Sequence, residues 1–356
     1  MTRTDIIEPK FKTTHVLHSR ISEIDMDNVP FGKVFSDHML VARYSDGVWH
    51  EPEIMPYSQI AFAPSISALH YGQAIFEGMK AYRGQDDEAL LFRPQDNWKR
   101  INYSASRLCM PDVPESIFID GLKELVKLDE KWIPPADKGA LYIRPHLFAT
   151  DEYIGVRASA SYMFVIFTCP VGKYYSEPVK LLATKEYTRA AIGGMGSAKA
   201  AGNYAASLLP DKLARKQGYD NVLWLDARLH QYIEECGTMN VFFVIENTVI
   251  TPQLTGTILA GITRDSLLRL LVDNGYNVEK RRISIYELDE AYNQGVFQEA
   301  FGAGTAATIA HISRIGFGGR DMELPTEHPV SDWLYTTLRG IQNGILPDPY
   351  GWVVRI

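Results

Sequence analysis

Lys199 carries a long, reactive side chain within a stretch of small residues. Eight of the ten residues from Gly193 to Gly202 are glycine, alanine or serine. Small neighbours let the backbone approach a bound molecule closely, and an amine in such a space can attack a carbonyl carbon to form a Schiff base. The alternative interpretation is a flexible glycine-rich loop that carries a solvated lysine.

Two glycine motifs resemble nucleotide-binding loops only in part. The P-loop requires Gly-Lys-Ser/Thr, whereas Ala198 and Ala200 flank Lys199. Residues 302–307, Gly-Ala-Gly-Thr-Ala-Ala, fit the dinucleotide pattern GxGxxG/A, but about fifty residues follow, and those after the turn favour a strand over a helix. We therefore expect 302–307 to form a turn, either a plain connection between strands or one whose N–H groups bind an anion.

Other residues could recognise a phosphate or a ring nitrogen. Thr263 opens a predicted helix, where free N–H groups and the helix dipole favour phosphate, and Arg100 can bind phosphate through two N–H groups. Glu234 and Glu235 are adjacent in a predicted strand, so one of the two can point inward. A buried carboxylate there could keep a pyridine nitrogen protonated. The structural alternatives are an ordinary helix cap, a solvated arginine and two exposed edge carboxylates.

Tyr142 and Arg144 lie two residues apart in a predicted strand, and so they share one face of it. An arginine among tyrosines is suited to binding a carboxylate, although a surface arginine stacked on a neighbouring ring is the alternative. Together the candidates comprise a Schiff-base lysine, a phosphate-binding helix start, an acid for a ring nitrogen and a carboxylate binder. Pyridoxal 5'-phosphate enzymes require this combination.

Composition excludes several classes of protein. The chain has 356 residues, a net charge of −7 and 46% hydrophobic residues. This acidic balance argues against nucleic-acid or anionic-membrane binding, and no apolar run is long enough to span a bilayer. The first residues lack the pattern of a targeting peptide, and the three cysteines are widely spaced, so we expect a reducing, cytoplasmic location. With neither an HExxH motif nor a CxxC pair, we expect no metal site.

The order of expected elements indicates a mixed α+β and α/β chain with two domains. We expect an N-terminal arm over 1–30, a small α+β domain over 31–170, a linker over 171–179, where proline and glycine interrupt the periodicity, and a larger domain over 180–356. In the small domain, Asp96 is predicted to cap a helix that continues through Leu108.

Five ordered motifs resemble those of the branched-chain amino-acid aminotransferases, which are fold-type-IV, class IV pyridoxal-phosphate enzymes. The resemblance extends from about Phe31 to the C-terminus. The motifs are FEGMKAYRG (76–84), LYIRP (141–145), AKAAGNYAASL (198–208), EECGTMNVFF (234–243) and FGAGTAA (301–307). The resemblance implies the D-amino-acid-aminotransferase-like fold with an active site between two domains.

The resemblance also implies the roles of the cofactor-binding residues. Lys199 would form the Schiff base with pyridoxal 5'-phosphate and move a proton during catalysis. Tyr204 would hydrogen-bond the ring hydroxyl, and Glu235 would bind the pyridine nitrogen. The residues implied to hold the phosphate are Arg100, Ile262, Thr263 and Thr305.

The implied substrates are leucine, isoleucine or valine and, as amino acceptor, 2-oxoglutarate. Arg144 would receive the distal carboxylate of glutamate, and the N–H groups of Thr305 and Ala306 would border the substrate α-carboxylate. The implied walls of the apolar pocket are Phe31, Tyr71, Phe76, Tyr142, Val156, Tyr174 and Thr238. The family resemblance implies a homodimer, in which Tyr71 and Val156 reach the pocket of the partner subunit.

One motif departs from part of the family. Some animal members carry a CxxC pair after the glycine turn, whereas this chain has Ala307-Thr308-Ile309-Ala310 there, which excludes that redox regulation. The remaining alternatives are a D-amino-acid transaminase, an aminodeoxychorismate lyase, a nucleotide-dependent oxidoreductase that uses residues 302–307, and an interaction module without a cofactor.

Overall fold

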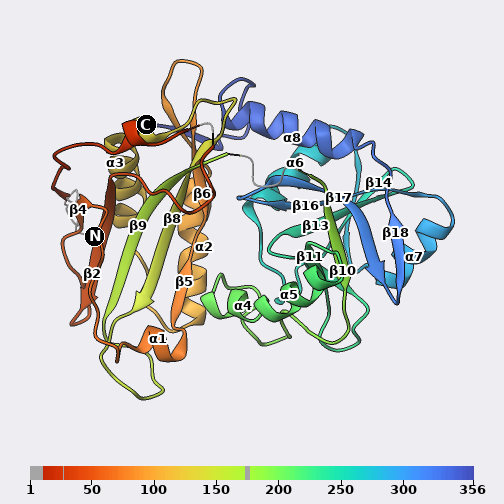
Figure 1. The fold of residues 1–356 in the computed structure, drawn as a ribbon, viewed down its shortest axis with the longest axis horizontal. Coiled ribbons are helices and arrows are strands. Elements are labelled where there is room, and N and C mark those ends of the chain that lie inside the picture. Colours follow the sequence, from red (N-terminus) through yellow and green to blue (C-terminus); the bar gives the residue numbers. More distant parts are fainter. Residues whose placement is uncertain (1–10, 27, 173–176) are drawn as a thin grey trace, which may run out of the picture. The chain divides into compact units, whose positions relative to one another are not determined.

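The computed structural model describes residues 11–26, 28–172 and 177–356, and these residues form two β-sheets, each with its own helices (Figure 1). The described residues up to Gly172 form one compact unit together with Gln342–Ile356. Those from residue 177 to Ile341 form the second. The mixed α/β character expected from the sequence is confirmed.

The sheet of the first unit is mostly antiparallel, in the order β1-β4-β2-β9-β8-β6-β7-β19. Its strands are β1 (Lys12–Thr13), β2 (His38–Ser45), β3 (Val48–Trp49), β4 (Glu53–Pro56), β5 (Ala74–Phe76), β6 (Met79–Arg83), β7 (Ala89–Phe92), β8 (Ala140–Ala149), β9 (Tyr162–Val171) and β19 (Val353–Arg355). The long pair β8 and β9 forms its centre. From Arg144 onward β8 alternates between partly exposed and buried side chains, as a strand with one covered face does.

Short helices cover part of this sheet, namely α1 (Ser67–Tyr71), α2 (Pro94–Arg107), a π-helical turn at Ser116–Asp120 and α3 (Gly121–Leu128). Helix α3 packs on β2 through buried leucines. The predicted cap at Asp96 is wrong, because α2 begins two residues earlier. Pro94 occupies the first turn, where its fixed φ suits a helix. Asp96 instead accepts a hydrogen bond from Arg93 Nε at 2.7 Å.

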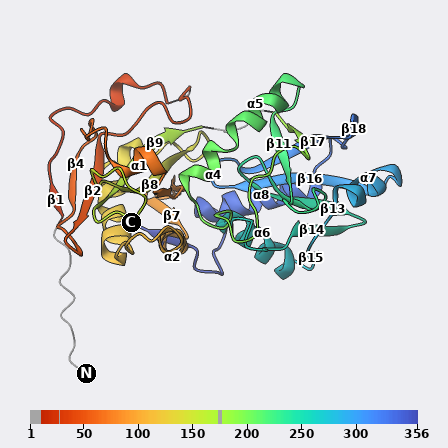
Figure 2. The ribbon, with the colours of Figure 1, turned by 90° about the horizontal axis from the view of Figure 1, so that it is seen from below.

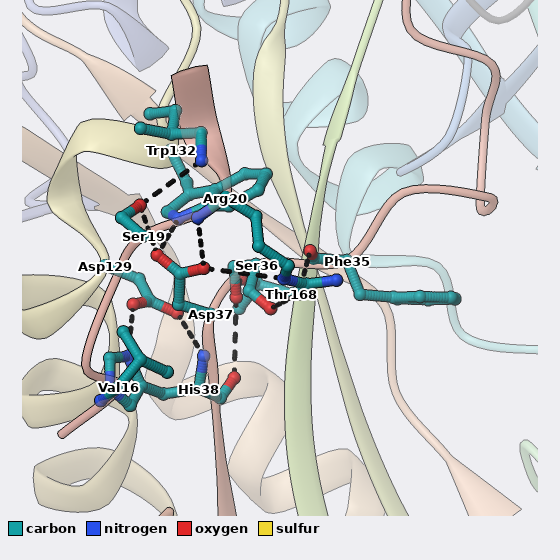
Figure 3. A network of polar contacts seen from close by, with 11 residues as sticks. Val16, Ser19, Arg20, Phe35, Ser36, Asp37, His38, Asp129, Trp132 and Thr168 are labelled. Atoms are coloured by element: carbon teal, nitrogen blue, oxygen red, sulfur yellow. Dashed lines mark hydrogen bonds and ion pairs between the residues drawn. The ribbon is translucent and has the colours of Figure 1, made fainter. Parts of the chain in front are cut away.

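The N-terminal arm is fixed to the first unit by a buried polar network (Figure 3). Asp37 accepts hydrogen bonds from Ser19 Oγ at 2.5 Å and Trp132 Nε1 at 2.9 Å. Burial opposes ionisation of Asp37, but these hydrogen bonds outweigh it and lower its pKa. His38 contacts Asp129 Oδ1 through Nδ1 at 2.6 Å and accepts the Val16 N–H at Nε2. The described arm residues therefore belong to the body of this unit.

The sheet of the second unit has the order β12-β11-β10-β17-β16-β13-β14-β15, with β18 beside β17. Its strands are β10 (Val179–Ala183), β11 (Asn221–Leu225), β12 (Ile233–Cys236), β13 (Asn240–Ile245), β14 (Thr248–Pro252), β15 (Asn277–Arg281), β16 (Phe297–Gly304), β17 (Thr308–Phe317) and β18 (Arg320–Glu323). Leu223, Phe243 and Ile312 are fully buried in its core. Glu246 and Asn247 join β13 to β14, and both residues have positive φ, as in a two-residue hairpin loop.

The helices of the second unit are α4 (Ala201–Ala205), α5 (Leu208–Lys216), α6 (Ile262–Asp273), α7 (Ile285–Asn293) and α8 (Pro329–Gln342). Helix α6 packs against β15 and β16, and Figure 2 shows it close to β15. Within the described part of the chain, no helix is long and apolar enough to cross a membrane.

The last residues of the chain return to the first unit. Strand β19 pairs antiparallel with β7, with Val354 opposite Leu91. The sequence pattern predicts that these residues belong to the larger domain, over 180–356. Gln342–Ile356 instead belong to the first unit, because β19 completes the edge of its sheet.

Candidate active site

Lys199 lies immediately before α4 and contacts a tyrosine in that helix. Its Nζ donates a hydrogen bond to the Tyr204 hydroxyl at 2.7 Å. The preceding loop is held by Asn203, whose Nδ2 donates to Met195 O and Ala198 O, both at 2.9 Å. The lysine therefore extends from a loop fixed by hydrogen bonds, which disagrees with the alternative of a loose glycine-rich loop.

The small residues before Lys199 allow tight packing. A Cβ on Gly196 would lie 2.2 Å from the carbonyl oxygen of Thr257 and 2.4 Å from the Ala190 methyl group. Gly193 has a φ of +81°, which favours glycine. These glycines let the Lys199 loop lie directly against the segment that contains Thr257.

Glu234 and Glu235 lie in the middle of β12 and face different pockets. Glu235 lines a pocket together with Ala198, Tyr204 and Thr238. Glu234 lines a separate cavity of about 310 Å³ and accepts a hydrogen bond from Thr257 Oγ1. Both carboxylates are buried, which corrects the expectation that one alone would point inward. Burial raises the pKa of Glu234.

The Glu235 carboxylate is held through both oxygens. Oε1 accepts the Leu259 N–H at 2.7 Å, and Oε2 lies 3.1 Å from Arg189 Nε. The side-chain amide of Asn240 lies 3.4 Å from Oε1.

Asn240 contacts three segments that carry predicted site residues. It begins β13, where its backbone pairs with Ala303 on β16, and its Nδ2 donates to Leu259 O at 2.9 Å. Gly261 packs so closely against it that a Cβ there would lie 2.0 Å from Asn240 Oδ1. The end of β12, the start of α6 and the end of β16 therefore meet around this one side chain.

Helix α6 begins at Ile262, directly after Gly261. Glycine at the N-cap position leaves the first turn without a side-chain cap. Thr263, in that turn, is buried. A helix start of this kind suits a phosphate group, because N–H groups of the first turn lack intrahelical acceptors.

Thr305 and Ala306 lie in the tight turn between β16 and β17. These strands are antiparallel neighbours, with Gly304 opposite Thr308. No helix follows the turn, so the dinucleotide-binding interpretation of residues 302–307 is wrong. A turn between strands is present as expected, but it is shorter than predicted, because residues 302–304 belong to β16.

The first unit contains a cluster of aromatic rings around Arg144. Its Nη2 donates to the Tyr142 hydroxyl at 3.0 Å, and its guanidinium lies 4.6 Å from the centre of the Phe76 ring. The ring of Phe31 packs edge-on against Tyr142 at 5.2 Å. The predicted shared face of Tyr142 and Arg144 is confirmed, and Phe31 and Phe76 belong to the same cluster.

Other predicted residues of the first unit lie elsewhere. Arg100, on α2, forms a two-point ion pair with buried Glu77. Tyr71 ends α1, and Val156 lies in the loop between β8 and β9, where it is 90% exposed. Tyr174 lies outside the described residues.

The residues of the second unit fit the chemistry of pyridoxal 5'-phosphate. A lysine amine suits its aldehyde group, the Glu235 carboxylate suits a protonated ring nitrogen, and the uncapped start of α6 suits its phosphate. Among residues 11–26, 28–172 and 177–356, no group of three or more histidine, cysteine, aspartate or glutamate side chains is arranged to hold a metal ion.

The sequence analysis missed several residues that position this site. Arg189, Asn240, Thr257 and Leu259 hold Glu235 and the Lys199 loop through side-chain and main-chain contacts. Asn240 stands within the EECGTMNVFF motif, which was the one available signal. The others act mostly across long sequence separations, and nothing in their local spacing indicates a role.

Comparisons with known proteins agree on one family. The model of the amino-transferase class IV family matches residues 74–315. A probable branched-chain-amino-acid aminotransferase of Staphylococcus epidermidis is 47% identical over 339 residues, which cover 93% of this chain and 94% of the relative. Branched-chain-amino-acid aminotransferase 2 of Bacillus subtilis is 44% identical, with 93% of each chain covered.

Solved structures show the same fold. The branched-chain aminotransferase of Thermoproteus uzoniensis, solved with norvaline, has a TM-score of 0.74 at 26% identity and covers 89% of this chain and 99% of its own. The enzyme of Thermobaculum terrenum, solved in its pyridoxal 5'-phosphate form, has a TM-score of 0.74 at 24% identity, with 89% and 97% covered. The chain therefore belongs to the class IV aminotransferases, which use pyridoxal 5'-phosphate, and within them to the branched-chain-amino-acid aminotransferase family.

Proposed function

We propose that the protein reversibly transfers the amino group of L-leucine, L-isoleucine or L-valine to 2-oxoglutarate, by a ping-pong mechanism with pyridoxal 5'-phosphate. The observation that carries this proposal is the Lys199 amine, 2.7 Å from the Tyr204 hydroxyl, beside a pocket that also contains the buried Glu235. The names of the most similar proteins support the choice of branched-chain substrates.

The bound cofactor would supply an electron sink for cleavage of the substrate Cα–H bond. Lys199 would attach the cofactor and move the proton at Cα. Tyr204 would orient the Lys199 amine and the ring hydroxyl, and the Glu235 carboxylate would hold the proton of the ring nitrogen. The phosphate would be held by Arg100, by Ile262 and Thr263 after Gly261 at the start of α6, and by Thr305 after Gly304 at the end of β16.

Substrate recognition would use Arg144 and the aromatic rings around it. The Arg144 Nε is buried and has no hydrogen-bond partner among the described residues. A buried donor without an acceptor is costly, and the distal carboxylate of glutamate would supply one. Tyr142, Phe76 and Phe31 would contact the apolar side chain of a branched-chain substrate. Further contacts are proposed for Thr238, Tyr174 and the N–H groups of Thr305 and Ala306.

A homodimer is part of the proposal. In the first unit, α1 and the loop after β8 carry large exposed apolar side chains. They are Leu69, Tyr71, Tyr153, Ile154 and Val156, of which Ile154 is 71% and Val156 90% exposed. Exposed apolar groups of this kind often mark protein interfaces, and Tyr71 and Val156 would line the pocket of the partner subunit. Light scattering should give a mass of twice 40.1 kDa.

We also propose that the second unit forms the cofactor-binding core. A cytoplasmic location is supported by Cys169 and Cys236, which are buried free thiols, since unpaired cysteines suit a reducing compartment.

The absorbance spectrum of the purified protein tests the reaction. We expect a visible band from bound pyridoxal 5'-phosphate, which L-leucine should bleach and 2-oxoglutarate should restore. Activity on D-alanine alone would favour a D-amino-acid transaminase, and formation of pyruvate from aminodeoxychorismate would favour the lyase. A colourless protein that binds NADH would contradict the whole assignment.

A further inference from the structure

Arg189 is a buried cation in contact with three parts of the candidate cofactor site. It precedes Lys199 by ten residues, in the segment between β10 and α4. Its side chain is 9% exposed, although no motif of the sequence singled it out. A buried guanidinium requires acceptors for its N–H groups and a negative charge nearby.

Two backbone carbonyls fix the guanidinium in place. Nη2 donates to Gly196 O at 3.2 Å and also to Thr257 O. Gly196 belongs to the loop that carries Lys199, and Thr257 lies in the segment before α6. Since a Cβ on Gly196 would collide with Thr257 O, the two chain segments lie close enough for one guanidinium to join them.

The same guanidinium is the charge partner of Glu235. Arg189 Nε lies 3.1 Å from Glu235 Oε2, and the Glu235 side chain is 5% exposed. Arg264 on α6 also acts electrostatically on Glu235, but its Nη2 donates to Pro252 O. Glu234 and Cys236 are the adjacent titratable groups, and both would repel a charge on Glu235 when ionised. A carboxylate as buried as this one is expensive to ionise without a paired cation.

We propose that Arg189 is a positioning residue for the cofactor, which keeps Glu235 ionised and aimed into the pocket so that it can bind a protonated ring nitrogen. This inference rests on the proposed function of Glu235 as the partner of that nitrogen. The backbone carbonyls of Gly196 and Thr257 position Arg189, and Arg189 in turn positions Glu235. Arg189 lines the same pocket as Glu235, and its proposed effect on cofactor binding acts through the charge and orientation of that carboxylate.

A double-mutant cycle on cofactor affinity tests this inference. Pyridoxal 5'-phosphate is titrated into the full-length protein after its own cofactor has been dialysed away, and binding is followed by the visible absorbance band. Arg189→Gln keeps a donor for the carbonyls but removes the charge, and we expect it to weaken binding about tenfold, whereas in a Glu235→Gln background it should change binding less than about twofold. Arg189→Lys, which keeps the charge, should restore most of the affinity.

The adjacent carboxylate supplies the control. Glu234→Gln removes a carboxylate that faces the other cavity, so it should leave the affinity within about twofold of the wild type. Equal weakening by Arg189→Gln in both backgrounds would show a purely structural role and overturn the inference. If the wild-type protein bound no pyridoxal 5'-phosphate at all, the proposed function itself would fail. If Arg189→Gln does not fold, the cycle is run with Arg189→Lys instead. A loss of affinity that is equally large in the wild-type and Glu235→Gln backgrounds would then contradict the inference.

Discussion

Glu77 and Arg100 form a two-point ion pair inside the first unit. Arg100 Nε lies 2.7 Å from Glu77 Oε1, and Nη2 lies 2.8 Å from Oε2. Glu77 is fully buried, and it also accepts hydrogen bonds from Asn97 Nδ2 and the Gly78 N–H. The arginine proposed to bind phosphate is therefore already oriented by a carboxylate of its own unit.

Glu77→Gln should destabilise the protein by about 3 kcal/mol, because it leaves a largely buried guanidinium without its counter-charge. Urea unfolding at neutral pH measures this change. Asp96→Asn is the matched control, since the Asp96 carboxylate, which pairs with Arg93, is 36% exposed, whereas the Glu77 carboxylate is fully buried. It should cost less than about 1 kcal/mol. Similar losses of unfolding free energy for the two substitutions would contradict the idea that the burial of Glu77 makes its ion pair important.

Lys199→Ala should reduce transamination about 1000-fold or more, because it removes both the attachment point of the cofactor and the group proposed to move the Cα proton. Lys199→Arg provides a control, as it keeps a cation and a donor for the Tyr204 hydroxyl but no nucleophilic amine. Steady-state rates with L-leucine and 2-oxoglutarate measure the loss. Substantial transaminase activity in either variant would contradict the proposed role of Lys199.

Arg144→Met should separate the two substrates. The KM for 2-oxoglutarate should rise about thirtyfold, which corresponds to a lost charge-assisted hydrogen bond of about 2 kcal/mol. The KM for L-leucine should change less than about threefold, because its side chain carries no charge. Arg144→Lys should show a smaller rise for 2-oxoglutarate. Equal changes in the two KM values would show that Arg144 acts through packing of the site and does not recognise the distal carboxylate.

His146 should make the first unit sensitive to acid. Burial, with a contribution from the charge of Arg144, lowers the pKa of His146 from 6.5 to about 4. Between these pH values the unfolded chain binds a proton that the folded chain does not, so stability falls as the pH falls. The full loss is about 3 kcal/mol, and it is complete below pH 4.

Urea unfolding of the wild type and of His146→Gln at pH 7, 5.5 and 4 measures this dependence. The substitution should reduce the loss of stability between pH 7 and pH 4 by about 3 kcal/mol. Parallel pH profiles for the two proteins would show that the His146 imidazole does not cause the sensitivity.

The sequence predicted the chemistry better than it predicted how that chemistry is held. Lys199, Glu235 and Thr263 could be found because motifs combine their side-chain types with glycine turns. Arg189 could not, since its importance depends on Glu235 and Thr257 being close in space. A contact between residues forty-six positions apart leaves no local pattern in a single sequence.

Element boundaries show the same limit. The sequence predicted a helix from Asp96 through Leu108, but the start of α2 depends on Pro94 and on the left-handed backbone of Arg93. Strand β19 has three residues, which is too short for a periodicity, and it exists because β7 offers an edge. Strand geometry predicted that Glu234 and Glu235 point to opposite faces of β12. It could not predict that both are buried, because that depends on other segments of the chain packing on each face.

The pairing of β19 with β7 has a consequence for synthesis of the chain. Residues of the first unit are translated both before and after those of the second, so the second unit is complete in sequence while the first still lacks its edge strand. Until Val353 leaves the ribosome, the outer N–H and C=O groups of β7 have no neighbour, and an open edge of this kind invites pairing with other chains. The nascent protein therefore depends on Val353–Arg355 to cover the edge of β7, which has been exposed since residue 92 was synthesised.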